Sequence, residues 1–69
     1  AKKELTRVLN AFLSSLQETE RNVFLCRYWY LDSIQTISEV SGFSQSKVTS
    51  MLHRLRGKLR KTLSEEGYV

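Results

Sequence analysis

The residues of this chain that are best suited to chemistry lie between positions 44 and 64, and they suit the binding of an anion. The chain of 69 residues has eleven Lys and Arg against seven Asp and Glu, a formal net charge of +4. Six of the eleven basic residues lie within residues 44–64, which contain no acidic residue. Positive charge gathered on one segment is typical of a nucleic-acid-binding element, although a basic helix face is also often only solvated.

Residues 44–64 also separate into two faces at helical spacing. At about 100° per residue, one face is apolar and consists of Val48, Met51, Leu52, Leu55, Leu59 and Leu63. The opposite face consists of Ser46, Ser50, His53, Arg54, Gly57 and Lys61. Ser44 stands where a side-chain oxygen can cap a helix N-terminus. We therefore predict a helix from Ser44 to about Ser64 that packs with one face and presents the other to a ligand.

The polar face has the composition needed to read duplex DNA. The major groove, about 12 Å wide, admits an α-helix whose first turns meet base edges. Small or polar side chains there let the backbone approach, and cations further along hold phosphates. By type, Gln45 suits adenine, Arg54 suits guanine and the methyl group of Thr49 suits thymine. The residues predicted to bind DNA are Ser44, Gln45, Ser46, Lys47, Thr49, Ser50, His53, Arg54, Arg56 and Lys58.

Other kinds of chemistry find little support in the sequence. His53 has no histidine, cysteine or carboxylate nearby in sequence, so it makes neither a metal site nor a general base. The single cysteine, Cys26, excludes an internal disulfide, and its apolar neighbours indicate a buried thiol. No nucleophile–base pair or glycine-rich phosphate loop is present, so we expect no enzyme activity, cofactor, metal or small-molecule substrate. No apolar run approaches the ~20 residues that span a bilayer.

Two helices are expected before the basic one, and their role is to cover its apolar face. Residues 2–16 carry apolar residues at the spacing of an amphipathic helix that ends around Ser14 or Ser15. A second helix should run from about Glu18 to Tyr28 or Trp29. Its apolar run, residues 23–26, predicts burial on more than one side. The aromatic run that follows, residues 28–31, is expected to lie in the core, with Tyr30 partly exposed, because aromatics dominate burial in small domains.

A short helix and a turn are expected directly before the basic helix. Asp32 or Ser33 should cap the short helix, whose inward stripe is Ile34, Ile37 and Val40. Gly42 supplies the left-handed conformation that ends a helix at low steric cost, and Phe43 should turn inward. Residues 32–63 thus have the form of a helix-turn-helix. The chain has room for one domain, residues 1–69, and we interpret it as part of a longer protein.

The succession of motifs resembles the fourth conserved region of bacterial sigma-70 family transcription factors, closest to the extracytoplasmic-function type. Residues 13–16 followed by 20–25 resemble the family's opening helix, and Arg27-Tyr28-Trp29 resembles the exit of that helix. Ser33 with Ile37 matches the first helix of the helix-turn-helix. The matches to its second helix are Gly42-Phe43-Ser44, Val48, residues 50–54, Arg56 and Leu59. The chain departs from the family at Leu31-Asp32, where Gly-Leu is common, and at Ser38, Ser41, Lys47 and Met51.

This resemblance implies an all-α fold, a four-helix right-handed bundle of winged-helix-like type that contains the helix-turn-helix. It implies a domain of the bacterial cytoplasm that binds the upstream (−35) element of promoter DNA while attached to the β-subunit flap of RNA polymerase. An anti-sigma protein is a further implied partner. By position, Ser44, Lys47, Thr49, Ser50, His53 and Arg54 would line the groove. Ser33, Ile34 and Gln35 would lie near phosphate.

Two alternatives remain open from the sequence alone. The first is the C-terminal helix-turn-helix of a LuxR-like response-regulator activator, which shares the four-helix layout and dimerises through its last helix. The six cations in residues 44–64 disfavour such self-association. The second is a basic amphipathic helix that lies on an anionic membrane or binds an acidic protein. That segment has no Trp or Phe to anchor it, so binding to a membrane is also disfavoured.

Overall fold

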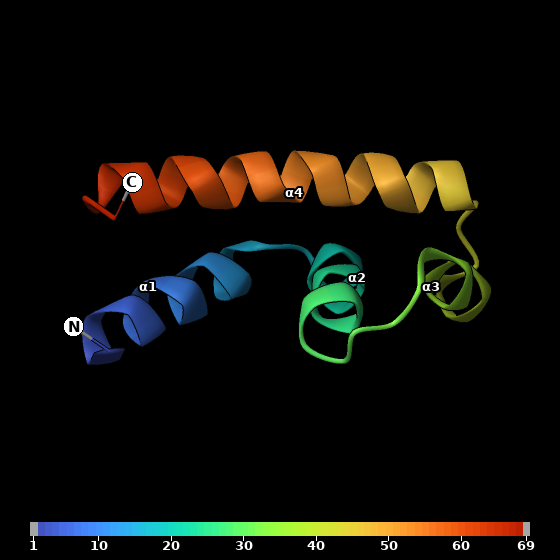
Figure 1. Cartoon of the computed structure of the whole chain (residues 1–69), viewed down its shortest axis with the longest axis horizontal. Coiled ribbons are helices and arrows are strands. Elements are labelled where there is room, and N and C mark those ends of the chain that lie inside the picture. Colours follow the sequence, from blue (N-terminus) through green and yellow to red (C-terminus); the bar gives the residue numbers. More distant parts are fainter. Residues whose placement is uncertain (1, 69) are drawn as a thin grey trace.

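The structure, a computed structural model, describes residues 2–68, with side chains from residue 4 onward. It contains four helices, α1 (Lys2–Ser15), α2 (Glu18–Tyr28), α3 (Ile34–Ser41) and α4 (Gln45–Glu65). The all-α prediction is confirmed, and the predicted helix ends agree to within about a residue. Figure 1 shows α1, α2 and α3 following one another along one side of α4, the longest helix. The molecule is elongated, with extents of 36 × 18 × 18 Å.

The turn between α3 and α4 is built as its residues predict. The Ser33 hydroxyl oxygen accepts a hydrogen bond from the Thr36 N–H at 3.1 Å and caps α3. Gly42 ends α3 with φ of 81°, and its N–H donates to the Ser38 carbonyl. The Ser44 hydroxyl oxygen accepts from the Lys47 N–H at 3.1 Å and caps α4. These local bonds fix the angle at which α4 leaves the turn.

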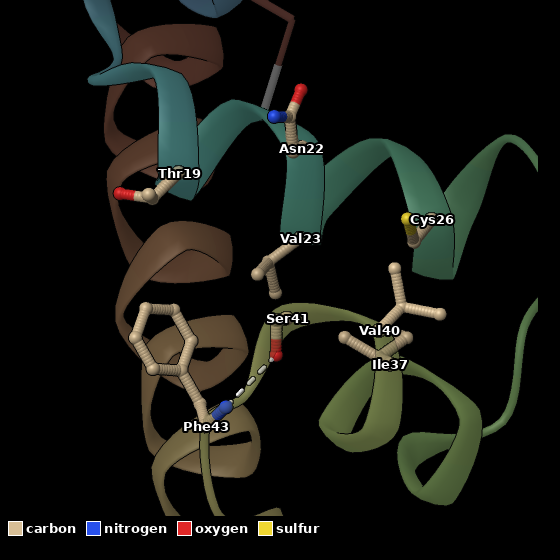
Figure 2. A pocket seen from close by; sticks show the side chains of 8 residues that line it. All are labelled: Thr19, Asn22, Val23, Cys26, Ile37, Val40, Ser41 and Phe43. Atoms are coloured by element: carbon tan, nitrogen blue, oxygen red, sulfur yellow. Dashed lines mark hydrogen bonds between the residues drawn. The ribbon is translucent and has the colours of Figure 1, made fainter.

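Two serines stabilise this turn in a way that the sequence did not predict. The Ser38 hydroxyl donates to the Phe43 carbonyl at 2.6 Å. The Phe43 N–H donates to the Ser41 hydroxyl at 3.2 Å, the bond drawn in Figure 2. Ser38 and Ser41 are two of the departures from the sigma-70 pattern. Their hydroxyls supply partners for backbone groups that lie past the helix end, where helical bonding stops.

The core lies along the apolar face of α4 in two clusters. One consists of Val23, Ile37, Val48, Met51 and Leu52. The other consists of Phe12, Leu16 and Leu55, with Leu13, Phe24 and Leu59 packed against it. The division of α4 into a buried and an exposed face is therefore confirmed. Fully burying one such side chain contributes about 1.5–3 kcal/mol, so the orientation of α4 about its own axis is strongly determined.

The expectation that residues 28–31 lie in the core is wrong. Trp29 is 76% exposed, Tyr30 67% and Leu31 80%. The reason is the direction of α2, which Figure 1 shows nearly end-on and therefore running across α4 rather than alongside it. Val23 lies near the crossing and is buried, whereas the end of α2 and the residues after it run past α4. For the same reason the Cys26 thiol is only half-buried, not buried as predicted.

The inward stripe predicted for α3 is also wrong at one residue. Ile37 is buried and Ile34 packs against the first cluster, but Val40 is 77% exposed. A stripe with spacing i, i+3, i+6 drifts around a helix of 3.6 residues per turn, so its last member leaves the contact. Figure 2 shows Val40 at the edge of a hollow between α2 and α3, opposite Cys26. The hollow measures about 240 Å³ and is mainly apolar.

Candidate DNA-binding surface

The residues predicted to bind DNA lie together on the exposed side of α4. All ten, from Ser44 to Lys58, are exposed, and the apolar residues interleaved with them are buried. We call this exposed side the polar face of α4; it also includes Gly57, Arg60 and Lys61. The helix-turn-helix thus brings every predicted residue of α4 to one surface, because burial of the apolar face fixes the orientation of α4 about its own axis.

The cations stand on both edges of the polar face, and small residues stand between them. At 3.6 residues per turn, one edge carries Lys47, Arg54, Lys58 and Lys61. Arg56 and Arg60 stand on the other edge. The middle of the face is formed by Ser46, Ser50 and Gly57. A helix in the major groove has a phosphate backbone on each side, so this arrangement places charge where the phosphates are.

The residues predicted to lie near phosphate form the first turn of α3. The side chains of Ser33 and Gln35 are exposed, whereas Ile34 is half-buried against the core. The Ile34 side chain is therefore unsuited to polar contact. Its contribution to phosphate binding would come from the backbone N–H groups of the first turn, which a helix leaves without internal partners.

Two cations of the polar face are held by residues outside it. Arg54 Nη2 donates to Glu20 Oε2 at 3.0 Å, although the two residues are 34 positions apart. Lys47 Nζ lies 4.4 Å from the centroid of the Phe43 ring, a cation–π contact with the turn. Sequence reasoning identified both cations but neither supporting contact. For Glu20 no local signal exists, since its proximity to Arg54 arises only from the packing of α2 on α4.

Among the described residues, the His, Cys, Asp and Glu side chains form no group of three that could hold a metal ion. Of the helices in the described range, none has both the length and the apolarity to cross a membrane.

A helix-turn-helix whose second helix carries an exposed polar face with cations on both edges defines a DNA-binding domain. The chain belongs to the sigma-70 family, since the family described as Sigma-70, region 4 matches residues 12–61. This match confirms the resemblance seen in the sequence and assigns the chain to DNA binding in transcription initiation. It also favours a sigma factor over a response-regulator activator. Comparisons with curated proteins and with solved structures gave no match.

Proposed function

We propose that this chain is the promoter-reading domain of a sigma factor. In this role the domain recognises the −35 element of the promoter while the domain itself is attached to RNA polymerase. The observation that carries the proposal is the polar face of α4, which is exposed along its length and has cations on both edges. This face belongs to a helix-turn-helix and lies within the residues matched by the sigma-70 family. In this account residues 1–69 form one DNA-binding domain of a longer sigma factor that works in the bacterial cytoplasm. The domain positions polymerase and performs no catalysis of its own.

The residues divide into base-reading and phosphate-binding roles. The first turns of α4 supply the base readers, with Arg54 suited to guanine and Gln45 to adenine. The full base-reading set is Gln45, Ser46, Thr49, Ser50, His53 and Arg54. The phosphate-binding set is Ser44, Lys47, Arg56 and Lys58 on α4, and Ser33, Ile34 and Gln35 at the start of α3.

The β-subunit flap of RNA polymerase is proposed to dock in an apolar groove between α1 and α2. The groove measures about 360 Å³, and its apolar lining includes Leu9, Phe12, Leu13, Phe24, Leu25, Tyr28 and Trp29. No residue of α4 lines it, so the flap and DNA can be bound at once. The exposure of Trp29 supports this choice, because exposed aromatics are enriched at protein interfaces. An anti-sigma protein is proposed as a further partner of the domain.

The proposal is tested by comparing two tyrosine substitutions on α4. Ser50 lies in the middle of the polar face and Ser64 in the last turn, and both are exposed. Duplexes enriched by the 69-residue chain from a randomised pool serve as the probe. Ser50→Tyr should abolish binding because the ring blocks entry to the groove, whereas Ser64→Tyr should bind like the parent. Equal binding by both variants, or no enrichment by the parent chain, would contradict the proposal.

A further inference from the structure

Glu20 is an acidic residue in direct contact with a surface expected to bind a polyanion. Its carboxylate Oε2 lies 3.0 Å from Arg54 Nη2. The Glu20 side chain is only 13% exposed, whereas that of Arg54 is 56% exposed. Among the described residues, Arg54 alone of the α4 cations has a carboxylate within ion-pairing distance. A carboxylate at this place weakens the attraction between the polar face of α4 and DNA phosphate. Its role is therefore not to strengthen phosphate binding.

The carboxylate lies nearer the packed part of the fold than the guanidinium does. Glu20 stands in the first turn of α2, where the helix dipole favours negative charge. Phe24, one turn further along α2, packs against the second cluster and anchors the helix. Glu20 is thus the more buried member of the pair, and Arg54 is the more exposed one. The bond restricts a long side chain that would otherwise sample many rotamers.

The bond leaves most of the guanidinium available. Arginine has five N–H donors, and Glu20 engages one through Nη2. Two donors remain free to pair with the O6 and N7 atoms of guanine, the commonest specific contact of arginine in the major groove. The nearby carboxylate also repels phosphate, so it biases Arg54 away from the backbone and toward a base edge.

We propose that Glu20 is a positioning residue that determines specificity: it holds Arg54 for base reading and excludes it from phosphate binding. This inference rests on the proposed function, because it needs a chain that prefers some duplexes over others. It extends the DNA-recognition machinery from the helix-turn-helix to α2. The inference also predicts that removing the negative charge of Glu20 lowers the preference for one duplex over another, although it removes a repulsion of the DNA.

The test measures specificity and total affinity separately. The probes are a duplex enriched from a randomised pool by the 69-residue chain and the same duplex with its preferred guanine replaced by adenine. Glu20→Gln keeps the shape and removes the charge. It should lower the affinity ratio of the two duplexes about tenfold, while affinity for the replaced duplex stays constant or rises. Glu18→Gln is the matched control, since Glu18 is exposed in the same turn and forms no ion pair with the residues that the structure describes.

A second pair of variants shows whether Glu20 acts on base preference through Arg54 or independently of it. In an Arg54→Ala background, Glu20→Gln should leave the affinity ratio unchanged. An undiminished ratio in Glu20→Gln alone, or an equal fall in both backgrounds, would overturn the inference. If Glu20→Gln unfolds, Glu20→Asp tests the contact by distance instead, because it keeps the charge but shortens the reach to Arg54, and it should also lower the affinity ratio. A parent chain that prefers no duplex would instead refute the proposed function, so the two failures are distinguishable.

Discussion

The Lys47 ammonium lies over the Phe43 ring, 4.4 Å from its centroid, and links the turn to the first turn of α4. Phe43 is half-buried against the core, so its packed ring supports a charge on the polar face of α4. A double-mutant cycle with Phe43→Leu and Lys47→Met should give a coupling free energy of about 0.5–1 kcal/mol in chemical denaturation. A coupling of zero would show that the contact contributes nothing to stability.

Leu31 occupies a backbone conformation that costs energy for any residue with a side chain. Its φ is 60°, and its side chain is 80% exposed, so no burial offsets the strain. Left-handed backbone costs an L-residue roughly 1–2 kcal/mol. Leu31→Gly should therefore raise the free energy of unfolding by about 1 kcal/mol, measured by urea denaturation. Leu31→Ala is the control and should bring no such gain, because alanine keeps the strain.

Gly57 lies in the interior of α4, where glycine is unfavourable. A Cβ added there would meet no atom within 4 Å apart from the adjacent residues and the nearby backbone of α4 itself. Gly57→Ala should stabilise the chain by about 1 kcal/mol, because alanine has the higher helix propensity. Thermal unfolding followed by circular dichroism measures the effect. A lower melting temperature would mean that α4 does not continue through this position as a regular helix.

Trp29 tests the proposed docking groove. At 76% exposure its loss should change stability by less than ~0.5 kcal/mol. Trp29→Ala should weaken binding to RNA polymerase core at least tenfold, because tryptophan is a frequent hot spot of interfaces. Tyr30→Ala is the matched control, an aromatic of 67% exposure that does not line the groove. Equal loss in both variants, or none in either, would place the docking surface elsewhere.

The parts of this fold that the sequence predicted are those with local causes. Ser33 and Ser44 cap helices through bonds to residues three positions away. Gly42 ends α3 through its own φ, and the faces of α4 follow from helical periodicity. The errors depend on how helices pack. Nothing local to Trp29 shows that α2 crosses α4. The stripe of α3 drifts around the helix, and only the packing of α3 decides that Val40 is the member left exposed.

The candidate site divides in the same way. Nine of its residues belong to one face of α4 and Ser44 caps that helix, so helical periodicity and the capping pattern were enough to group them. Glu20 could not be found by such reasoning, because its 34-residue separation from Arg54 is closed only by tertiary packing. Ile34 was included by its position in the sigma-70 pattern, although helical spacing had placed it on the inward stripe, and the structure confirms that its side chain packs inward.

The central claim is that the first turns of α4 read bases while its later cations hold phosphates. The most direct measurement is the affinity of Arg54→Ala and Lys61→Ala for an enriched duplex and its single-base variants at several salt concentrations. Arg54→Ala should lose preference at one base pair. Lys61→Ala should weaken every duplex alike and reduce the log–log salt slope by about 1. A uniform loss across all duplexes for Arg54→Ala would contradict the account.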